Sequence, residues 1–239
     1  CACLVGSEMC IRDRYKAVQE THLPLACCRY DTFADALPAE AAPPAAVKRL
    51  DGPAHLDALL HDHAVDYGLW NKLYSATLLT PALLDNDLAY NEDLLANWQA
   101  FCAAPGCAFC DWPGYHYRQH ADSASRRGLP PQSLDDQRRA AALIRGSVPG
   151  QWPVLQQSAN AFYYEKLVYL ASMILRRADI EPYRVQLGEL RIGITAGLND
   201  RQLGRNPQLP FAIKVSAWAT VHAPKLWRKV CRKYLKDRQ

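Results

Sequence analysis

The sequence predicts a mainly α-helical protein, and two periodic stretches support that prediction. Between residues 152 and 177, apolar side chains recur at spacings of three and four, which places them along one side of a helix. A similar pattern covers residues 45–79 and is interrupted near Gly52 and Pro53, which break helices. No run approaches the ~18 consecutive apolar residues that a membrane-spanning helix needs, so we expect no transmembrane segment.

Composition supports a folded chain. Hydrophobic residues make up 49% of the 239 residues and charged residues 22%, which is typical of a globular protein and not of a disordered one. A chain of this length can bury a core without disulfides or other staples.

Two shorter helices are predicted from their start signals. Thr80 and Pro81 fit the N-cap and the first helical position, and an apolar stripe follows them as far as Phe101. Ser133 fits a capping residue before an acidic first turn, and the helix that it opens ends near Ile144.

Residues 183–221 permit two interpretations. Three glycines within ten residues would cost a helix about 1 kcal/mol each, and apolar residues alternate around Gly188 and Glu189, so the first interpretation is a small β-hairpin or sheet. The helical alternative begins at Pro210 and places four residues on one face: Phe211, Val215, Trp218 and His222.

The N-terminal residues Cys3 to Asp13 read CLVGSEMCIRD, which resembles the translated end of a transposase-based sequencing adapter. The resemblance implies that residues 1–14 are an adapter-derived segment and that the native N-terminus is missing. It also reduces the cysteines to be interpreted from nine to six. Residues 15–46 follow as an irregular lead-in, because prolines near its end prevent a continuous helix.

The strongest chemical signal lies between Cys102 and His120, where three cysteines and two histidines fall within nineteen residues. Cys107 and Cys110 are spaced as in a zinc knuckle, and His116 and His120 as on the first turn of a helix. We therefore predict a short Cys/His metal-binding loop at residues 102–120. It would hold zinc through Cys107, Cys110, His116 and His120, with Cys102 as a substitute ligand. Four protein ligands leave no open position, so the zinc would be structural and we predict no catalytic residue here.

Two alternatives to zinc remain. Cys102, Cys107 and Cys110 have the spacing of a ferredoxin-type iron-sulfur cluster, which needs a fourth ligand nearby. The other alternative is a set of thiols without metal. Clustered cysteines favour a reducing compartment, so we expect a cytoplasmic protein, and the richness in Ala, Leu, Arg and Pro is typical of a bacterial source.

The second informative stretch is a predicted basic helix at residues 224–237. From Lys225 to Arg238 the net charge is +6, although the whole chain carries only +4. Charge concentrated in this way is typical of an element that contacts phosphate groups. The candidate nucleic-acid contacts are Lys225, Arg228, Lys229, Arg232, Lys233 and Lys236.

Other roles for this helix remain open. Its pattern also fits a helix that packs on the protein by its apolar stripe and keeps its lysines in solvent. It fits a helix that lies on a membrane surface as well. Trp227 and Tyr234 fall on the apolar side, so we do not expect them to stack on bases.

These features predict one mostly helical domain at residues 47–239, with a Cys/His insertion at 102–120 and a basic C-terminal helix. The predicted function is that of a zinc-stapled nucleic-acid-binding protein, a subunit of a nucleoprotein assembly, rather than an enzyme. Its expected partners are the backbone of DNA or RNA and other protein subunits. Two further classes are a metal-dependent enzyme that acts on nucleic acid with His and Asp from residues 55–93, and a protein-interaction module without metal.

Overall fold

The computed structural model describes residues 7–34, 47–61, 65–80, 83, 87–119 and 130–234, with side chains from residue 11 onward. The chain divides into two compact units. Unit 1 comprises residues 1–128 and 149–152, and unit 2 comprises residues 129–148 and 153–239. The single domain predicted for residues 47–239 spans parts of both units.

Unit 1 is built around a four-stranded sheet with the order β2-β4-β1-β3. β1 and β4 run parallel in the centre, while β2 and β3 pair antiparallel at the edges. In the central pair, Ala26 lies opposite Ala108 and Cys28 opposite Cys110. The strands are β1 (Leu25–Phe33), β2 (Lys48–Asp51), β3 (Lys72–Tyr74) and β4 (Gly106–Arg118).

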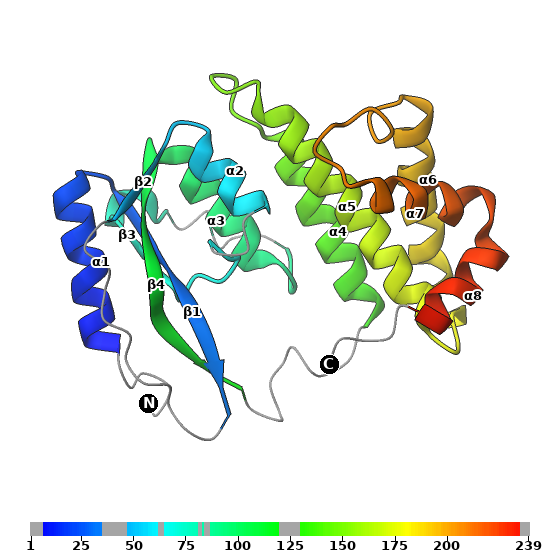
Figure 1. The fold of residues 1–239 in the computed structure, drawn as a ribbon, viewed down its shortest axis with the longest axis horizontal. Helices are drawn as coiled ribbons and strands as arrows, with labels where there is room; N and C mark the ends of the chain where they lie inside the picture. The colour runs from blue at the N-terminus through cyan, green and yellow to red at the C-terminus, as the bar shows by residue number, and fades with distance from the viewer. Residues whose placement is uncertain are drawn as a thin grey trace. The chain divides into compact units, whose positions relative to one another are not determined.

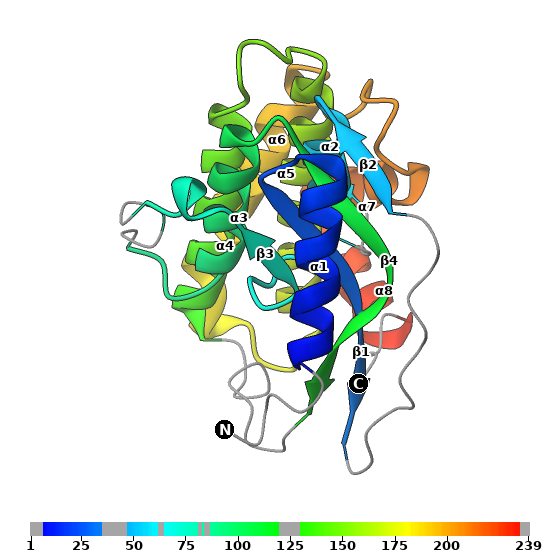
Figure 2. The same ribbon diagram turned by 90° about the vertical axis from the view of Figure 1, so that its left-hand side faces the viewer.

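Helices cover both faces of this sheet (Figure 1). α1 (Ser7–Thr21) lies along one face, as Figure 2 shows. α2 (Ala54–His61) and α3 (Glu92–Ala103) lie on the other face, and the short 3₁₀ helix η1 (Ala76–Leu78) follows β3. Because successive side chains of a strand point to opposite faces, the even-numbered residues of β1 and β4 pack under α1: Ala26, Cys28, Ala108, Cys110 and Trp112.

Every regular element in the described part of unit 2 is a helix, and the unit is organised around α5 (Leu155–Arg176), which packs against α4, α6, α7 and α8. The apolar stripe predicted for residues 152–177 is buried here, with Leu167, Leu170 and Ile174 fully enclosed. The surrounding elements are α4 (Pro131–Gly146), η4 (Glu181–Tyr183), α6 (Arg184–Asn199), α7 (Phe211–His222) and α8 (Pro224–Tyr234).

The hairpin or sheet predicted for residues 183–221 is wrong, because α6 and α7 occupy that region. Close packing explains two of the three glycines of α6. A Cβ at Gly197 would lie 2.3 Å from Cε1 of Tyr164, and a Cβ at Gly193 would lie 2.8 Å from Cδ1 of Leu167. Glycine therefore lets α6 approach α5, which offsets its low helix propensity.

Two more segments differ from the expectation. The lead-in predicted to be irregular contains the end of α1 and the whole of β1. The predicted metal-binding loop at residues 102–120 is the end of α3 followed by the long strand β4. The sheet therefore lies in the part of the chain where no strand was predicted.

At the chain ends, α1 spans the predicted boundary of the adapter-derived segment. Arg14 is buried in α1, with Nη1 3.4 Å from Sγ of Cys28, and the origin of residues 1–14 stays a prediction. α8 ends at Tyr234, so Lys236 lies outside the described residues. Of the helices that the structure describes, none is long and apolar enough to cross a bilayer.

Candidate polyanion-binding face

The structure separates the two cysteines at the centre of the predicted zinc site. Cys107 and Cys110 are three positions apart on β4, so they point to opposite faces of the sheet. Cys107 Sγ lies 3.3 Å from Sγ of Cys27, and both side chains are fully buried. Cys110 packs with Cys28 beneath α1.

The other predicted ligands lie elsewhere. The Nδ1 atom of His116 is hydrogen-bonded to the carboxylate of Asp31, on the neighbouring strand. Cys102 is half-buried on α3, and His120 lies outside the described residues. Within the described ranges, no group of three or more His, Cys, Asp or Glu side chains is placed to hold a metal ion. The zinc site stays a prediction, and the structure brings together a pair of thiols, Cys27 and Cys107.

Burial favours the protonated form of the Cys107 thiol. It raises the pKa of Cys107 well above that of an ordinary thiol, helped by the hydrogen bond to Cys27. Burial likewise raises the pKa of Cys110 and of Cys102 to about 12. A metal would have to displace a proton from each, since the thiolate is the ligand form.

A buried lysine lies beside the thiol pair. Lys72 pairs with Cys27 in the sheet, and its Nζ atom is 2.7–3.0 Å from four acceptors. Three of these are main-chain carbonyls and the fourth is Oδ1 of Asn71. Burial lowers the pKa of Lys72, and these acceptors replace the water that its ammonium group loses.

One histidine in the range of the enzyme hypothesis, residues 55–93, is enclosed in the core. His55 is fully buried on α2, and its ring nitrogens face main-chain carbonyls of Gly52 and Phe101, the second at 2.7 Å. Burial is the main cause that lowers its pKa. The nearby residues 62–64 and 84–86 lie outside the described part of the chain.

Charge is divided unequally between the two units. Unit 1 has 10 Lys and Arg against 16 Asp and Glu, a net charge of −6, whereas unit 2 has 18 against 8, a net charge of +10. Of this +10, +6 lies between Lys225 and Arg238, so the predicted concentration stays at the terminal helix and the rest of unit 2 carries a further +4. A field of this sign attracts polyanions.

On α8, four cations project from one side. Lys225, Lys229, Arg232 and Lys233 are all exposed. At 3.6 residues per turn, these positions fall within an arc of about 100°. None of the four takes part in an ion pair within the described residues.

The opposite side of α8 anchors it to the unit. Cys231 is fully buried, and Arg228 Nη2 donates a 2.8 Å hydrogen bond to the carbonyl of Ala178. Arg228 was predicted to contact nucleic acid, but its guanidinium group is engaged with the main chain beyond α5. The predicted apolar stripe is only partly covered, since Tyr234 and Leu226, which lies at the border between the stripe and the cations, are 67% and 65% exposed.

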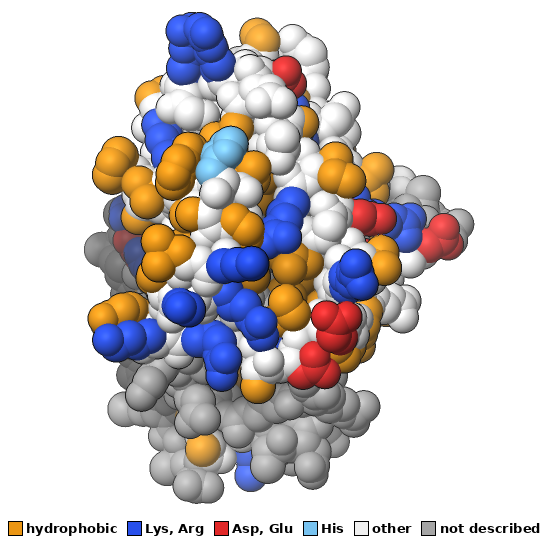
Figure 3. Space-filling model, turned by 90° about the vertical axis from the view of Figure 1, so that its right-hand side faces the viewer, with side chains coloured by type: hydrophobic (Ala, Val, Ile, Leu, Met, Phe, Trp, Pro, Cys, Tyr) orange, Lys and Arg blue, Asp and Glu red, His pale blue; other side chains and the backbone are white. Residues whose placement is uncertain are grey.

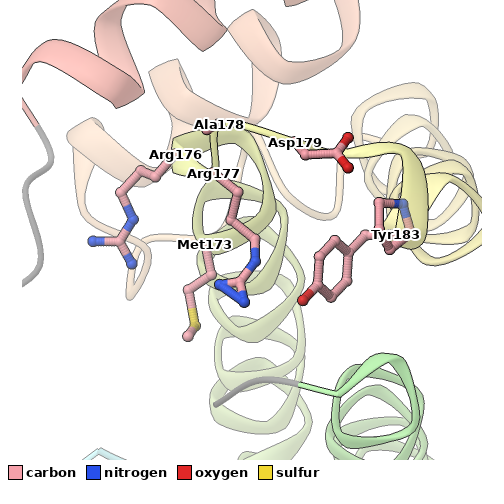
Figure 4. Close-up of a pocket in the computed structure, with 7 residues that line it drawn as sticks. Met173, Arg176, Arg177, Ala178, Asp179 and Tyr183 are labelled. Carbon is pink, nitrogen blue, oxygen red and sulfur yellow. The ribbon is translucent and has the colours of Figure 1, made fainter.

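A shallow hollow of about 460 Å³ lies next to this anchor, at the end of α5. It is lined by Met173, Arg176, Arg177, Ala178, Asp179, Pro182 and Tyr183. The guanidinium carbon of Arg177 lies 4.8 Å from the ring centre of Tyr183, and in Figure 4 these two side chains lie together while Arg176 points away. Arg177 and Tyr183 thus line the hollow, next to the carbonyls of Arg177 and Ala178 that accept hydrogen bonds from Arg228.

Helix α7 carries a second set of exposed side chains, and the sequence did not predict that they lie at the surface. The predicted helical face of Phe211, Val215, Trp218 and His222 forms, and all four side chains are exposed. Figure 3 shows Lys and Arg side chains gathered among exposed hydrophobic ones on this side of the molecule. We call the exposed side chains of these two helices the α7–α8 face: Phe211, Val215, Trp218 and His222 of α7, with Lys225, Leu226, Lys229, Arg232 and Lys233 of α8.

Comparison with known proteins gives no relative from which a function could be transferred. No protein-family model matches the chain, and no curated protein matches it.

Proposed function

We propose that unit 2 binds a polyanion whose charge is carried by phosphate groups, through the exposed cations of α8. The observation that supports this most directly is the arc of four exposed cations, Lys225, Lys229, Arg232 and Lys233, on a helix whose other side is anchored in the unit. Within the described residues these four cations have no carboxylate partner, and such ammonium and guanidinium groups match a row of phosphates.

The charge balance supports the same conclusion. The net charge of +10 on unit 2 attracts a polyanion over long range, and the cations of α8 give it a place to bind. The backbone of DNA or RNA and the headgroups of anionic lipids both carry such phosphates. Binding of either polyanion does not require the predicted zinc site, whose candidate ligands belong to unit 1. The zinc site is therefore a separate hypothesis.

Salt-dependent binding tests the proposal. We expect the full chain to bind a fluorescein-labelled single-stranded oligonucleotide or vesicles containing phosphatidylglycerol, and to release them as salt rises. For four contacts to a single strand, a rise from about 50 to about 200 mM salt weakens binding about 50-fold.

A matched pair of variants locates the site. Lys229→Glu/Lys233→Glu reverses two charges on α8, and Arg139→Glu/Arg205→Glu reverses two exposed charges elsewhere in unit 2. Both variants lower the net charge by the same amount, so only the first should abolish binding. Equal loss in both would show that binding follows the net charge alone and that α8 is not the site.

A further inference from the structure

Helix α7 packs Ile213 and Val221 on the core of the unit but carries three other large apolar side chains on the outside. Phe211, Val215 and Trp218 are 80%, 42% and 55% exposed, whereas the small residues Ala217 and Thr220 are fully buried. A helix that packs only against its own protein normally has the reverse arrangement, with its large apolar side chains in the core.

The exposed residues form a continuous stripe. Phe211, Val215, Trp218 and His222 are spaced by four, three and four, so they fall within an arc of about 60° at 3.6 residues per turn. The rings of Trp218 and His222 are 5.3 Å apart, which makes the stripe a connected surface. Exposed apolar patches of this kind mark interaction sites.

The cations of α8 follow directly along the chain. The Trp227 N–H donates to the carbonyl of Ala223 at 2.8 Å, so the turn between α7 and α8 is hydrogen-bonded. On α8, Leu226 is 65% exposed, and at 3.6 residues per turn it falls on the same side as Lys225, Lys229 and Lys233. The α7–α8 face thus combines apolar side chains and cations.

We propose that the α7–α8 face docks on the surface of a bilayer that contains anionic phospholipid. This inference rests on the proposed function and names the partner of that site. The lysines and Arg232 would meet headgroup phosphates, while Phe211, Val215 and Leu226 enter the boundary with the acyl chains. Trp218 would lie at headgroup level, where tryptophan is enriched.

The side chains on the face favour a membrane over the other occupants. Val215 and Leu226 have no aromatic ring on which a base could stack, so nucleic acid would leave them exposed to water. A second copy that docked the same face on this one would bring two rows of cations together, which disfavours association. An anionic bilayer surface offers phosphates to the cations and an apolar boundary to the stripe.

Co-sedimentation of the full chain with vesicles tests the inference. The vesicles would contain either phosphatidylcholine alone or phosphatidylcholine with 30% phosphatidylglycerol, and we expect binding to the second only. Phe211→Ser/Trp218→Ser should weaken that binding at least tenfold. Lys229→Glu/Lys233→Glu should weaken it more, at about fivefold for each cation neutralised.

The matched control is Val185→Ser/Ile192→Ser, which removes two exposed apolar side chains from α6, 68% and 72% exposed. It should leave binding within twofold of the wild type. Circular dichroism would show that each variant keeps its helices, which is expected because all the substituted side chains are exposed.

The outcomes separate the two proposals. Oligonucleotide binding without vesicle binding would overturn membrane docking and leave the proposed function standing, as would vesicle binding that the stripe variant does not weaken. No binding to either probe would overturn both. A dimer in solution that Phe211→Ser/Trp218→Ser dissociates would identify a second copy as the occupant and overturn membrane docking.

Discussion

The glycines of α6 allow a sharp test of the helical structure at residues 184–199, because two identical substitutions should have opposite effects. Gly197→Ala would place a Cβ 2.3 Å from Cε1 and 2.6 Å from Cζ of Tyr164. Carbon atoms in ordinary contact are about 3.5–4.0 Å apart, so the ring would have to move by about 1 Å. Tyr164 is only 1% exposed, and its hydroxyl lies 3.2 Å from Oε1 of Gln202, so the ring has little freedom to move.

The expected magnitudes follow from two opposing effects. Overpacking a core costs about 1–3 kcal/mol, and replacing glycine by alanine in a helix returns up to about 1 kcal/mol. We therefore expect Gly197→Ala to lower the free energy of unfolding by about 1–2 kcal/mol. A Cβ at Gly188 meets nothing within 4 Å, so Gly188→Ala should raise the free energy of unfolding by about 0.5–1 kcal/mol.

Urea unfolding followed by circular dichroism at 222 nm measures both changes. The comparison also decides between the helix and the hairpin considered for this region. In a hairpin, Gly188 would occupy a turn position with positive φ, and alanine there would destabilise the protein. A loss of stability in Gly188→Ala, or a gain in Gly197→Ala, would refute the packing of α6 described above.

Three further predictions concern unit 1. Lys72→Met should lower the free energy of unfolding by about 2–4 kcal/mol, because it removes the ammonium donor from three main-chain carbonyls and from Oδ1 of Asn71; a loss below about 1 kcal/mol in urea unfolding would contradict that. Burial lowers the pKa of His55 in the folded protein. As the pH falls, the unfolded chain therefore binds a proton at this histidine before the folded chain does. The stability that neutral His55 contributes is complete above about pH 6.5, the ordinary pKa of histidine, and declines below it. Unfolding measured between pH 7.5 and 5.5 should therefore depend less on pH in His55→Gln than in the wild type, and equal slopes would exclude this role. The zinc hypothesis predicts one equivalent of zinc in native mass spectrometry of the purified chain, lost in Cys107→Ser/Cys110→Ser, and zinc that persists in that variant would rule out these ligands.

The helical part of the fold was accessible from periodicity. α5 lies within the predicted range 152–177. An amphipathic helix repeats its apolar residues every three or four positions, and that pattern is visible in the sequence. The helical alternative for residues 211–222 was also readable from Pro210 and the spacing that follows. The glycines of α6 misled because their cost to a helix is local, whereas the close approach to Tyr164 that offsets it is tertiary.

The sheet could not be found by the same signals. β1 begins with four buried residues, Leu25 to Cys28, so it lacks the alternation of a half-buried strand. β4 contains Pro113 and Gly114, which normally indicate turns. The parallel pairing of these two strands joins segments about 80 residues apart, and no local pattern encodes it.

For the candidate site too, local features could be predicted from the sequence, whereas features that depend on tertiary contacts could not. Cys107 and Cys110 have the spacing of a zinc knuckle, but both lie on a strand, where side chains three positions apart point to opposite faces of the sheet. The cations of α8 were identified correctly as a local concentration of charge, while the anchoring role of Arg228 depends on carbonyls of a distant segment. Periodicity also defined the face of α7, but whether a face meets a core or solvent is decided by the rest of the fold.

Docking of the α7–α8 face on anionic membranes is the central claim, and quenching of tryptophan fluorescence by brominated lipids tests it most directly. Vesicles of phosphatidylglycerol and phosphatidylcholine with brominated acyl chains should quench the wild-type protein, because Trp218 is exposed on the docking face. Trp218→Phe should still bind these vesicles and lose most of the quenching. Vesicle binding with no quenching, or with equal quenching in Trp218→Phe, would show that the face does not meet the bilayer.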